Sequence, residues 1–366
     1  MKAIKFFAIT AMAAAMITSC SNEDELSQSN YPSDNIIRIT AGVNNAKTRA
    51  EGAGTPLENP LSLTVVNKYT ETTLAAKYTY VNKVFKKNDN VWTCSEAEAQ
   101  TQPLLWQNKE TLVDIAALAP AQEGKFDGVY NKETRKFSSF SYSVADDQST
   151  SSDNNDLLYY YAKDFKPGES LKDGKLSIQM NHAFCMIDIV VTLGTEFNKP
   201  NVLDDSPIVK VTLGGTKIAA NVDVKNAPTS STTGTTEGTT EGSTTTGSTT
   251  ASFVTASGEA TDITTTKGTF TPAVNAEKKA DPEVNAISSF SCIAIPQTVA
   301  ANTFKVSLKT AGKLYEWTST DAVELKSGYR YTLELTMGNN VVLLKGGSIT
   351  AKPWTEITSD KPLETD

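Results

Sequence analysis

Histidine is nearly absent from this sequence, since His182 is the only one among 366 residues. A Ser-His-Asp triad, a Cys-His pair or a His-ligated metal site would have to use it. The nearest carboxylate on the same face of its predicted strand is Asp188. Six residues at about 3.3 Å each place Asp188 roughly 20 Å away, beyond hydrogen-bond reach. We interpret His182 as a packed, hydrogen-bonded core residue; a carboxylate from another segment is the alternative that would restore a catalytic hypothesis.

Cysteine is scarce and irregularly spaced. Beyond Cys20 the chain has Cys94, Cys185 and Cys292. One disulfide is possible in an exported chain, but this spacing excludes a dense disulfide framework and a CxxC metal site. We expect these three residues to act mostly as small buried hydrophobes.

Common catalytic motifs are also absent. The chain has no Gly-rich phosphate loop, no HExxH and no GxSxG. A pair of carboxylates acting as in a glycosidase is the remaining enzymatic alternative, and among 42 acidic residues it has little specificity. The polar residues 153–156 do not follow the EF-hand calcium pattern, so we interpret them as a solvated loop. We therefore predict that the protein is not an enzyme and needs no metal or cofactor.

Basic charge is in deficit. The net charge is −8, and no stripe of Lys and Arg is present. Nucleic-acid binding needs clustered cations that neutralise phosphates, so we exclude nucleic acid as a partner. At about 150 residues per domain, the length suggests two domains.

No apolar run reaches the roughly 20 residues of a membrane-spanning helix. An apolar stretch at 6–17 follows two lysines, which predicts a signal peptide at residues 1–19. The residues around Cys20 resemble a bacterial lipobox, in which the thiol is acylated and the chain is cut before it. Two or more acyl chains would tether the mature protein to a membrane. An ordinary signal peptide is the alternative; the acidic residues 23–25 resemble a surface-export signal or form a solvated linker.

Alternating apolar residues between short turn clusters predict a mostly β protein. Within residues 36–43, Ile37, Ile39 and Val43 share one face of a predicted strand. The polar stretch that follows contains Gly and Pro, which predicts an exposed loop with Arg49 at its middle.

Three later features organise the rest of the chain. The face occupied by apolar residues switches near Asn181, which predicts a bulge or bend. The polar residues 195–207 include two prolines and predict a domain boundary. The Thr-rich residues 228–250 contain almost no apolar side chains, so they form a tolerated disordered insertion or a glycosylated tip.

These features together resemble the fimbrillin family, whose members build the type V pili of Gram-negative bacteria. The resemblance covers nearly the whole chain, and the order of its short motifs carries it. The motifs are the lipobox at Cys20, KTRA around Arg49, NHAFCMIDIVV from Asn181, IPQTV from Ile295, LKSGYRYTLELTM from Leu325 and a closing Ile-x-x-x-Pro-Trp that ends at Trp354.

The resemblance implies an all-β fold with two transthyretin-like β-sandwich domains, at residues 50–200 and 201–366, after a lipidated pro-segment at 20–49. It also implies export to the cell surface as an outer-membrane lipoprotein, anchored in outer-membrane lipid through acylated Cys20. An arginine-specific surface protease would then cut between Arg49 and Ala50.

Cleavage would release the strand at 36–43, which carries Ile37, Ile39 and Val43. The resemblance implies that a neighbouring pilin subunit fills the vacated groove with its C-terminal segment, by strand addition to a sheet edge. We expect this donor within residues 341–357, with Val341, Leu343, Ile349 and Trp354 as its apolar side chains. The chain would be a stalk or tip subunit; the alternative is a permanently anchored surface lipoprotein that binds a glycan or a host ligand.

Overall fold

The computed structural model describes residues 30–44, 55–89, 91–95, 102–121, 124–150, 155–197, 204–228, 252–275, 277–281, 283–338, 340–345 and 349–354. The predictions for the signal peptide, Cys20, Arg49, Ala50 and the Thr-rich tract lie outside these residues, apart from Pro228. In the described part, no helix is both long and apolar enough to cross a bilayer.

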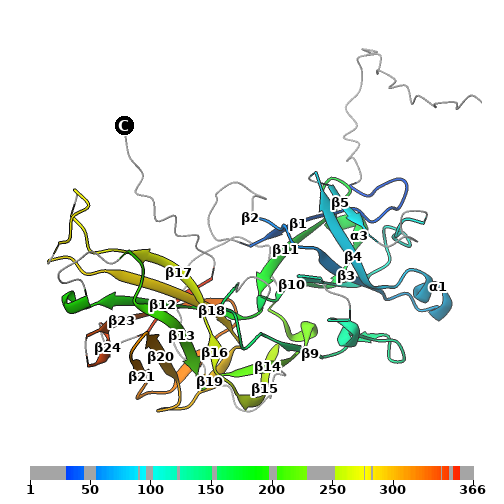
Figure 1. Ribbon diagram of the computed structural model, residues 1–366. Helices are drawn as coiled ribbons and strands as arrows, with labels where there is room; N and C mark the ends of the chain where they lie inside the picture. Colours follow the sequence, from blue (N-terminus) through cyan, green and yellow to red (C-terminus); the bar gives the residue numbers. More distant parts are fainter. Residues whose placement is uncertain are drawn as a thin grey trace, which may run out of the picture.

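The predicted all-β fold is confirmed, and its largest sheet has eight strands (Figure 1). Their spatial order is β2 (Thr55–Pro56), β1 (Ile39–Val43), β11 (Leu176–His182), β10 (Leu158–Phe165), β6 (Val113–Ala119), β3 (Leu61–Asn67), β4 (Tyr80–Asn88) and β5 (Val91–Cys94).

A six-stranded sheet and a four-stranded sheet occupy the other end of the molecule (Figure 1). The six-stranded sheet contains β17 (Thr266–Thr271), β18 (Ile287–Ala294), β12 (Cys185–Leu193), β23 (Tyr329–Met337), β24 (Val342–Leu344) and β25 (Thr350–Pro353). The four-stranded sheet has the order β16 (Ile263–Thr264), β13 (Ile208–Gly214), β20 (Lys305–Thr310) and β21 (Leu314–Thr318).

Smaller sheets and short helices complete the fold. The sheets are β15 (Val254–Ala260) with β14 (Lys217–Val222) and β9 (Phe140–Ser143), β19 (Gln297–Val299) with β22 (Val323–Leu325), and β7 (Tyr130–Asn131) with β8 (Lys136–Phe137). The helices are α1 (Thr72–Lys77), α3 (Pro167–Ser170) and the 3-10 turns Asp127–Val129, Thr195–Phe197 and Val224–Asn226.

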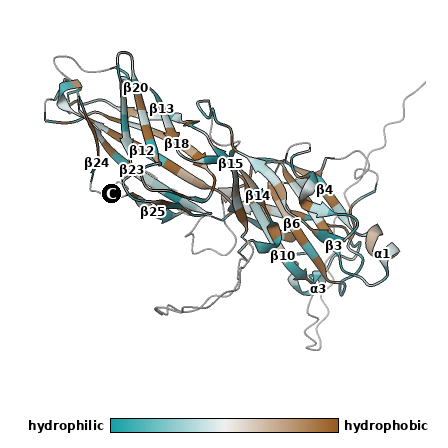
Figure 2. Cartoon of the chain, turned by 90° about the horizontal axis from the view of Figure 1, so that it is seen from below, coloured by the Kyte–Doolittle hydropathy of each residue, from teal (hydrophilic) through white to brown (hydrophobic). Residues whose placement is uncertain are grey.

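Period-two alternation explains how these strands pack. Along β12, buried residues alternate with partly exposed ones over the whole strand. The same alternation on β6 divides its side chains between two apolar clusters: Ala116 and Leu118 join one, whereas Ile115 and Ala117 join the other. Figure 2 shows hydrophobic bands along β6, β10, β12 and β18. We call the cluster that contains Ile115 the β1-side cluster, because it also contains Ile37 and Ile39.

The chain changes sheet earlier than the predicted boundary at 200/201. Strand β11 belongs to the eight-stranded sheet, whereas β12 pairs with β18 and β23 in the six-stranded sheet. Strand β9 also pairs across the predicted division, with β14. The switch of face near Asn181 therefore marks a passage between sheets: Met180 packs in the β1-side cluster and Cys185 in the other. The boundary at 200/201 stays a prediction, because polarity marks an exposed connection as readily as a domain border.

Candidate assembly site

Strand β1 lies inside the eight-stranded sheet, between β11 and the two-residue β2. It runs parallel to β11 from Ile39 opposite Leu176 to Val43 opposite Met180. Its other edge pairs antiparallel with β2. The preceding residues are held too, since the Ile37 N–H donates to the Leu104 carbonyl at 2.8 Å.

The apolar side chains of β1 and its lead-in face the β1-side cluster. Ile37 is 5% exposed and Ile39 is 4% exposed, while Val43 is half-buried against the same cluster. A cavity of about 450 Å³ lies alongside them, lined partly by Phe85 and Trp92. The segment therefore fills an apolar groove, with free space along one side.

Strand β11 depends on β1 for most of its backbone pairing. Among the described residues, Leu176 to Met180 pair with β1, whereas β10 pairs with β11 only at Asn181 and His182. The side chains of Leu176, Ile178 and Met180 are fully buried. Without β1, this stretch would expose both its hydrogen-bonding groups and its apolar side chains.

An exposed ion pair precedes β1. The Arg38 guanidinium lies 2.5 Å from the Asp34 carboxylate. Its hydrogen bond to the carboxylate is the main cause that lowers the pKa of Asp34 to about 2. Exposed pairs of this kind contribute little to stability, so burial of Ile37 and Ile39 holds the segment in place.

The predicted donor segment lies along one edge of β23. Strand β24 pairs antiparallel with Leu335 to Met337, and β25 pairs antiparallel with Tyr329 to Thr332. Val342 is buried, but Val341 is 49% exposed and Leu343 is 58% exposed. All residues of β25 are exposed. Most side chains of this edge segment therefore face solvent.

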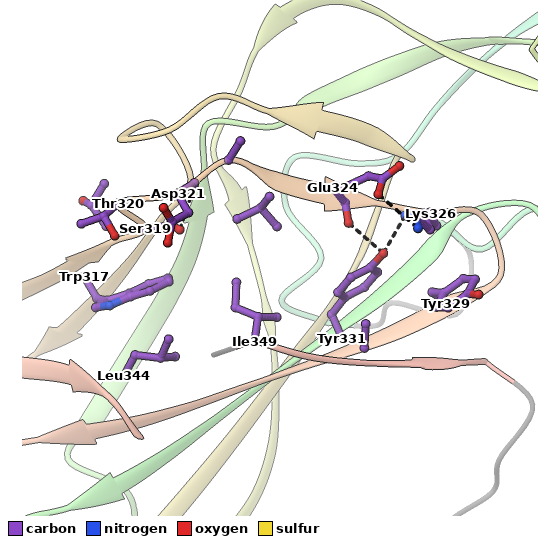
Figure 3. A pocket seen from close by; sticks show the side chains of 14 residues that line it. Trp317, Ser319, Thr320, Asp321, Glu324, Lys326, Tyr329, Tyr331, Leu344 and Ile349 are labelled. Carbon is purple, nitrogen blue, oxygen red and sulfur yellow. Dashed lines mark hydrogen bonds and ion pairs between the residues drawn. The ribbon is translucent and has the colours of Figure 1, made fainter. Parts of the chain in front are cut away.

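A groove of about 600 Å³ lies beside this segment (Figure 3). Leu344 and Ile349 of the segment face Trp317 and Tyr331 across it, and polar residues from β21 to β22 form its rim. The Tyr331 hydroxyl donates to the Glu324 carbonyl at 2.9 Å. Burial is the main cause that raises the pKa of Tyr331 to about 12, so this phenol remains a neutral donor at physiological pH.

Two motifs that are far apart in the sequence meet at the end of this segment. The Trp354 indole stacks on the His182 imidazole, with ring centroids 3.7 Å apart and planes 12° apart. The imidazole Nδ1 lies 2.7 Å from Asp156 Oδ2. The lone histidine is thus covered by an aromatic ring on one face and fixed by a carboxylate.

This arrangement identifies the partner of His182 that sequence spacing missed. The sequence predicts Asp156 in a solvated loop, yet its side chain is 12% exposed and contacts the imidazole. The pairing of Leu158 with His182 brings the two residues together, and no local spacing signals it. Asp188 Oδ1 instead accepts a hydrogen bond from Arg330 Nη2 at 3.1 Å. Across the described residues, no group of three or more His, Cys, Asp or Glu could hold a metal ion.

Among the described residues, no disulfide joins Cys94, Cys185 and Cys292. Cys185 and Cys292 are fully buried on the neighbouring strands β12 and β18, and Cys94 is partly exposed on β5. Burial raises the pKa of both buried thiols, that of Cys292 to about 12. These two residues pack as small hydrophobes, which matches the expectation from the sequence.

Comparisons with known proteins address the fold and the family. A proposed cell adhesion protein from Bacteroides ovatus is 14% identical to this chain, with a TM-score of 0.54. The superposition covers 87% of this chain and 97% of that protein's chain. Another from Bacteroides uniformis is 14% identical, with coverages of 88% and 100% and a TM-score of 0.51. These similarities concern the fold.

The tip fimbrial protein Mfa3 from Porphyromonas gingivalis, 8% identical, covers 82% of this chain and 95% of its own with a TM-score of 0.41. No curated protein sequence matches. The fimbrillin-like family model matches residues 48–354. This match spans most of the chain and confirms what the order of motifs indicated: the protein belongs to the fimbrillin-like family.

Proposed function

We propose that this protein is a non-enzymatic structural subunit, in the stalk or at the tip, of a surface fimbria that assembles by strand exchange between subunits. One observation carries the proposal: an N-terminal strand, β1, supplies the backbone pairing of a buried strand, β11. A fold that depends on one terminal strand can accept an equivalent strand from another molecule in its place.

Removal of β1 would make the insertion of a replacement strand strongly favourable. Burying Ile37 and Ile39 contributes about 1.5–3 kcal/mol each, and the main-chain ladder adds to that. The groove would also expose the buried side chains of β11. An extended apolar segment from a neighbouring pilin subunit restores both contributions.

Export and processing fit the order of the segments. In the proposal, acylated Cys20 holds the precursor in the outer membrane, and an arginine-specific surface protease cuts between Arg49 and Ala50. This bond lies between β1 and β2 in the sequence. The cut therefore separates β1 from the body of the protein while β2 stays with it.

The C-terminal residues 341–357 are the proposed donor. They include an edge segment whose Val341 and Leu343 side chains are largely exposed. Exposed apolar residues on a sheet edge favour pairing with another chain, and natural proteins ordinarily suppress them. Ile349 and Trp354 would supply the remaining apolar side chains of the donor.

The test is to treat the purified precursor with a trypsin-like protease. We expect a new N-terminus at Ala50 by mass spectrometry and ladders of multimers on unboiled gels. An Arg49→Gln precursor should stay uncut and monomeric. A synthetic peptide of residues 341–357 should block the ladders, and the same peptide with Leu343 and Ile349 replaced by Asp should not.

A soluble monomer after complete cleavage at Arg49 would overturn the proposal. A mature protein on cells that begins at acylated Cys20 and lacks the cut would favour the permanently anchored lipoprotein. Mass spectrometry of the surface protein therefore separates the two hypotheses.

A further inference from the structure

The contact between His182 and Trp354 joins β11, the strand that loses its partner in the proposed mechanism, to the proposed donor segment. His182 is the last residue of β11, which pairs with β1, and Trp354 directly follows β25 in the proposed donor. The two rings stack at a centroid distance of 3.7 Å. The position of the imidazole therefore decides whether the indole has a surface to pack on.

Asp156 fixes the imidazole. Both side chains are 12% exposed, and Asp156 Oδ2 lies 2.7 Å from His182 Nδ1. Asp156 Oδ1 is buried, with no hydrogen-bond partner among the described residues. A buried carboxylate needs a partner, so these two side chains hold each other in one orientation.

Backbone contacts complete the site. The Trp354 N–H donates to the Gly328 carbonyl at 2.6 Å, and the Gly328 N–H donates to the Phe184 carbonyl at 2.9 Å. Gly328 has a φ of +71°, and a Cβ there would lie 3.4 Å from the His182 carbonyl oxygen. Glycine suits this left-handed conformation. We call His182, Asp156 and Gly328 the Trp354 socket.

The rest of β25 is held weakly. Its four residues pair with β23, but all are exposed. Trp354 is half-buried and packs against the larger apolar cluster. The Trp354 socket therefore supplies a side-chain contact that holds this part of the C-terminal segment on its own subunit.

We propose that the Trp354 socket retains the C-terminal segment on its own subunit until β1 leaves, and that loss of β1 loosens the socket. The occupant is Trp354 of the same chain. This inference rests on the proposed function, because it supplies the step that makes the donor available only after processing.

Strand β11 provides the connection. The Asn44 N–H donates to the Met180 carbonyl at 2.8 Å, and Asn44 Nδ2 donates to Asn181 Oδ1 at 2.8 Å. Asn181 directly precedes His182. When β1 and Asn44 depart, the described pairing of β11 is reduced to its two positions with β10, and one of them is His182 itself. Fewer contacts then hold the imidazole against the indole.

Hydrogen exchange of the backbone amides within 350–354, where every residue except Pro353 has an N–H, tests the proposal on the full precursor. Trp354→Ala should speed this exchange about tenfold before any cleavage. The reason is that an aromatic pair changes the equilibrium constant for local opening of the segment by about tenfold. His182→Gln, which keeps a donor for Asp156 but loses the ring, should have a similar effect. Lys352→Ala is the matched control on the same strand and should leave exchange unchanged.

The second experiment cleaves the precursor at Arg49 and removes the N-terminal fragment at a concentration where the protein is monomeric. Exchange at 350–354 should then be as fast as in the uncleaved Trp354→Ala variant. The inference is overturned if exchange stays unchanged in Trp354→Ala, or if it stays slow after β1 has left. Fast exchange without multimers would contradict the proposed function alone, whereas multimers with unchanged exchange would contradict the inference alone.

Discussion

Strand β1 and the segment β24–β25 both lie near the edges of sheets, but they are held in different ways. The β1 segment buries Ile37 and Ile39 in an apolar cluster and supplies the pairing of β11. The residues of β25 are all exposed, and one stacked tryptophan follows them. Hydrophobic burial holds the first segment. In the second segment Val342 of β24 is buried, whereas β25 is held by its backbone ladder and the ring contact that follows it.

This difference suits the two proposed roles. A segment held by buried side chains stays in place until its covalent link is cut and a competitor replaces it. A segment held mainly by an exposed ladder and one ring contact can leave once that contact loosens, because local opening of such regions has a low free energy. Under the proposal, the molecule therefore combines a firmly held N-terminal strand with a readily released donor segment.

The largest expected effect distinguishes the two segments by stability. Ile39→Ala in β1 should lower the free energy of unfolding by about 2–5 kcal/mol, because it leaves a cavity in a buried site. Ala351→Ser in β25 should change it by less than about 0.5 kcal/mol, as is usual for exposed positions. Urea unfolding of both precursor variants measures this difference in free energy. Equal losses of unfolding free energy would show that β1 and β25 contribute equally to stability.

A smaller effect separates folding from assembly within β24. Val342→Ala should lower the free energy of unfolding by about 1.5 kcal/mol, since two buried methyl groups are lost. Leu343→Ala should leave stability unchanged yet slow the formation of multimers, because this side chain is exposed in the monomer. Urea unfolding and unboiled gels give the two measurements. Normal assembly of Leu343→Ala would count against this residue as a donor contact.

Thiol labelling compares the two apolar clusters after cleavage. Cys94 lines the cavity beside β1, so its reaction with maleimide should speed up severalfold when β1 is removed. Cys185 and Cys292 should stay unreactive until the protein unfolds. Equal exposure of all three cysteines would mean that loss of β1 unfolds the whole chain.

The same buried thiols predict how stability depends on pH. Burial raises the pKa of Cys292 to about 12, whereas an unfolded thiol titrates near about 8.5. The folded state therefore holds more protons between these values, and this stabilising contribution is lost as pH rises from about 8.5 towards 12. Cys292→Ala should reduce this alkaline loss, as measured by urea unfolding at several pH values. An unchanged pH dependence would contradict the assignment.

The smallest effect concerns the exposed ion pair before β1. The Asp34 carboxyl should titrate with a midpoint at about 2 in an NMR pH titration, and Arg38→Gln should return it towards 3.8. Asp34 therefore supports the folded state above its unfolded pKa, and this support is lost as pH falls towards 2. A normal midpoint in the intact precursor would show that the pair does not form in solution.

Local patterns were sufficient to predict the strands. Alternation placed Ile37 and Ile39 on one face of a strand, and the structure buries both. The switch of face near Asn181 also had a physical cause, since the chain changes sheet there. The presence of a strand, and the face on which each of its side chains lies, follow from the alternation of apolar and polar residues. Any single segment carries this alternation in its own sequence.

Pairing between distant segments could not be predicted in this way. Nothing near Trp354 specifies His182, and nothing near His182 specifies Asp156, because these contacts arise from how β25, β11 and β10 are arranged. The pairing of β12 and β9 with strands beyond residue 200 could not be predicted for the same reason: the polarity of a segment indicates its exposure, whereas the sheet that a strand joins depends on long-range pairing. The motif resemblance identified both the Asn-His-Ala and the Pro-Trp motifs but not their contact.

The structure of the processed, assembled fibre by electron cryomicroscopy tests the central claim most directly. The strand that lies beside Leu176 to Met180 should come from residues 341–357 of a neighbouring subunit, and Trp354 of that neighbour should have left its own His182. A fibre in which residues 36–43 still occupy this position, or in which each C-terminal segment remains on its own β23, would contradict the account.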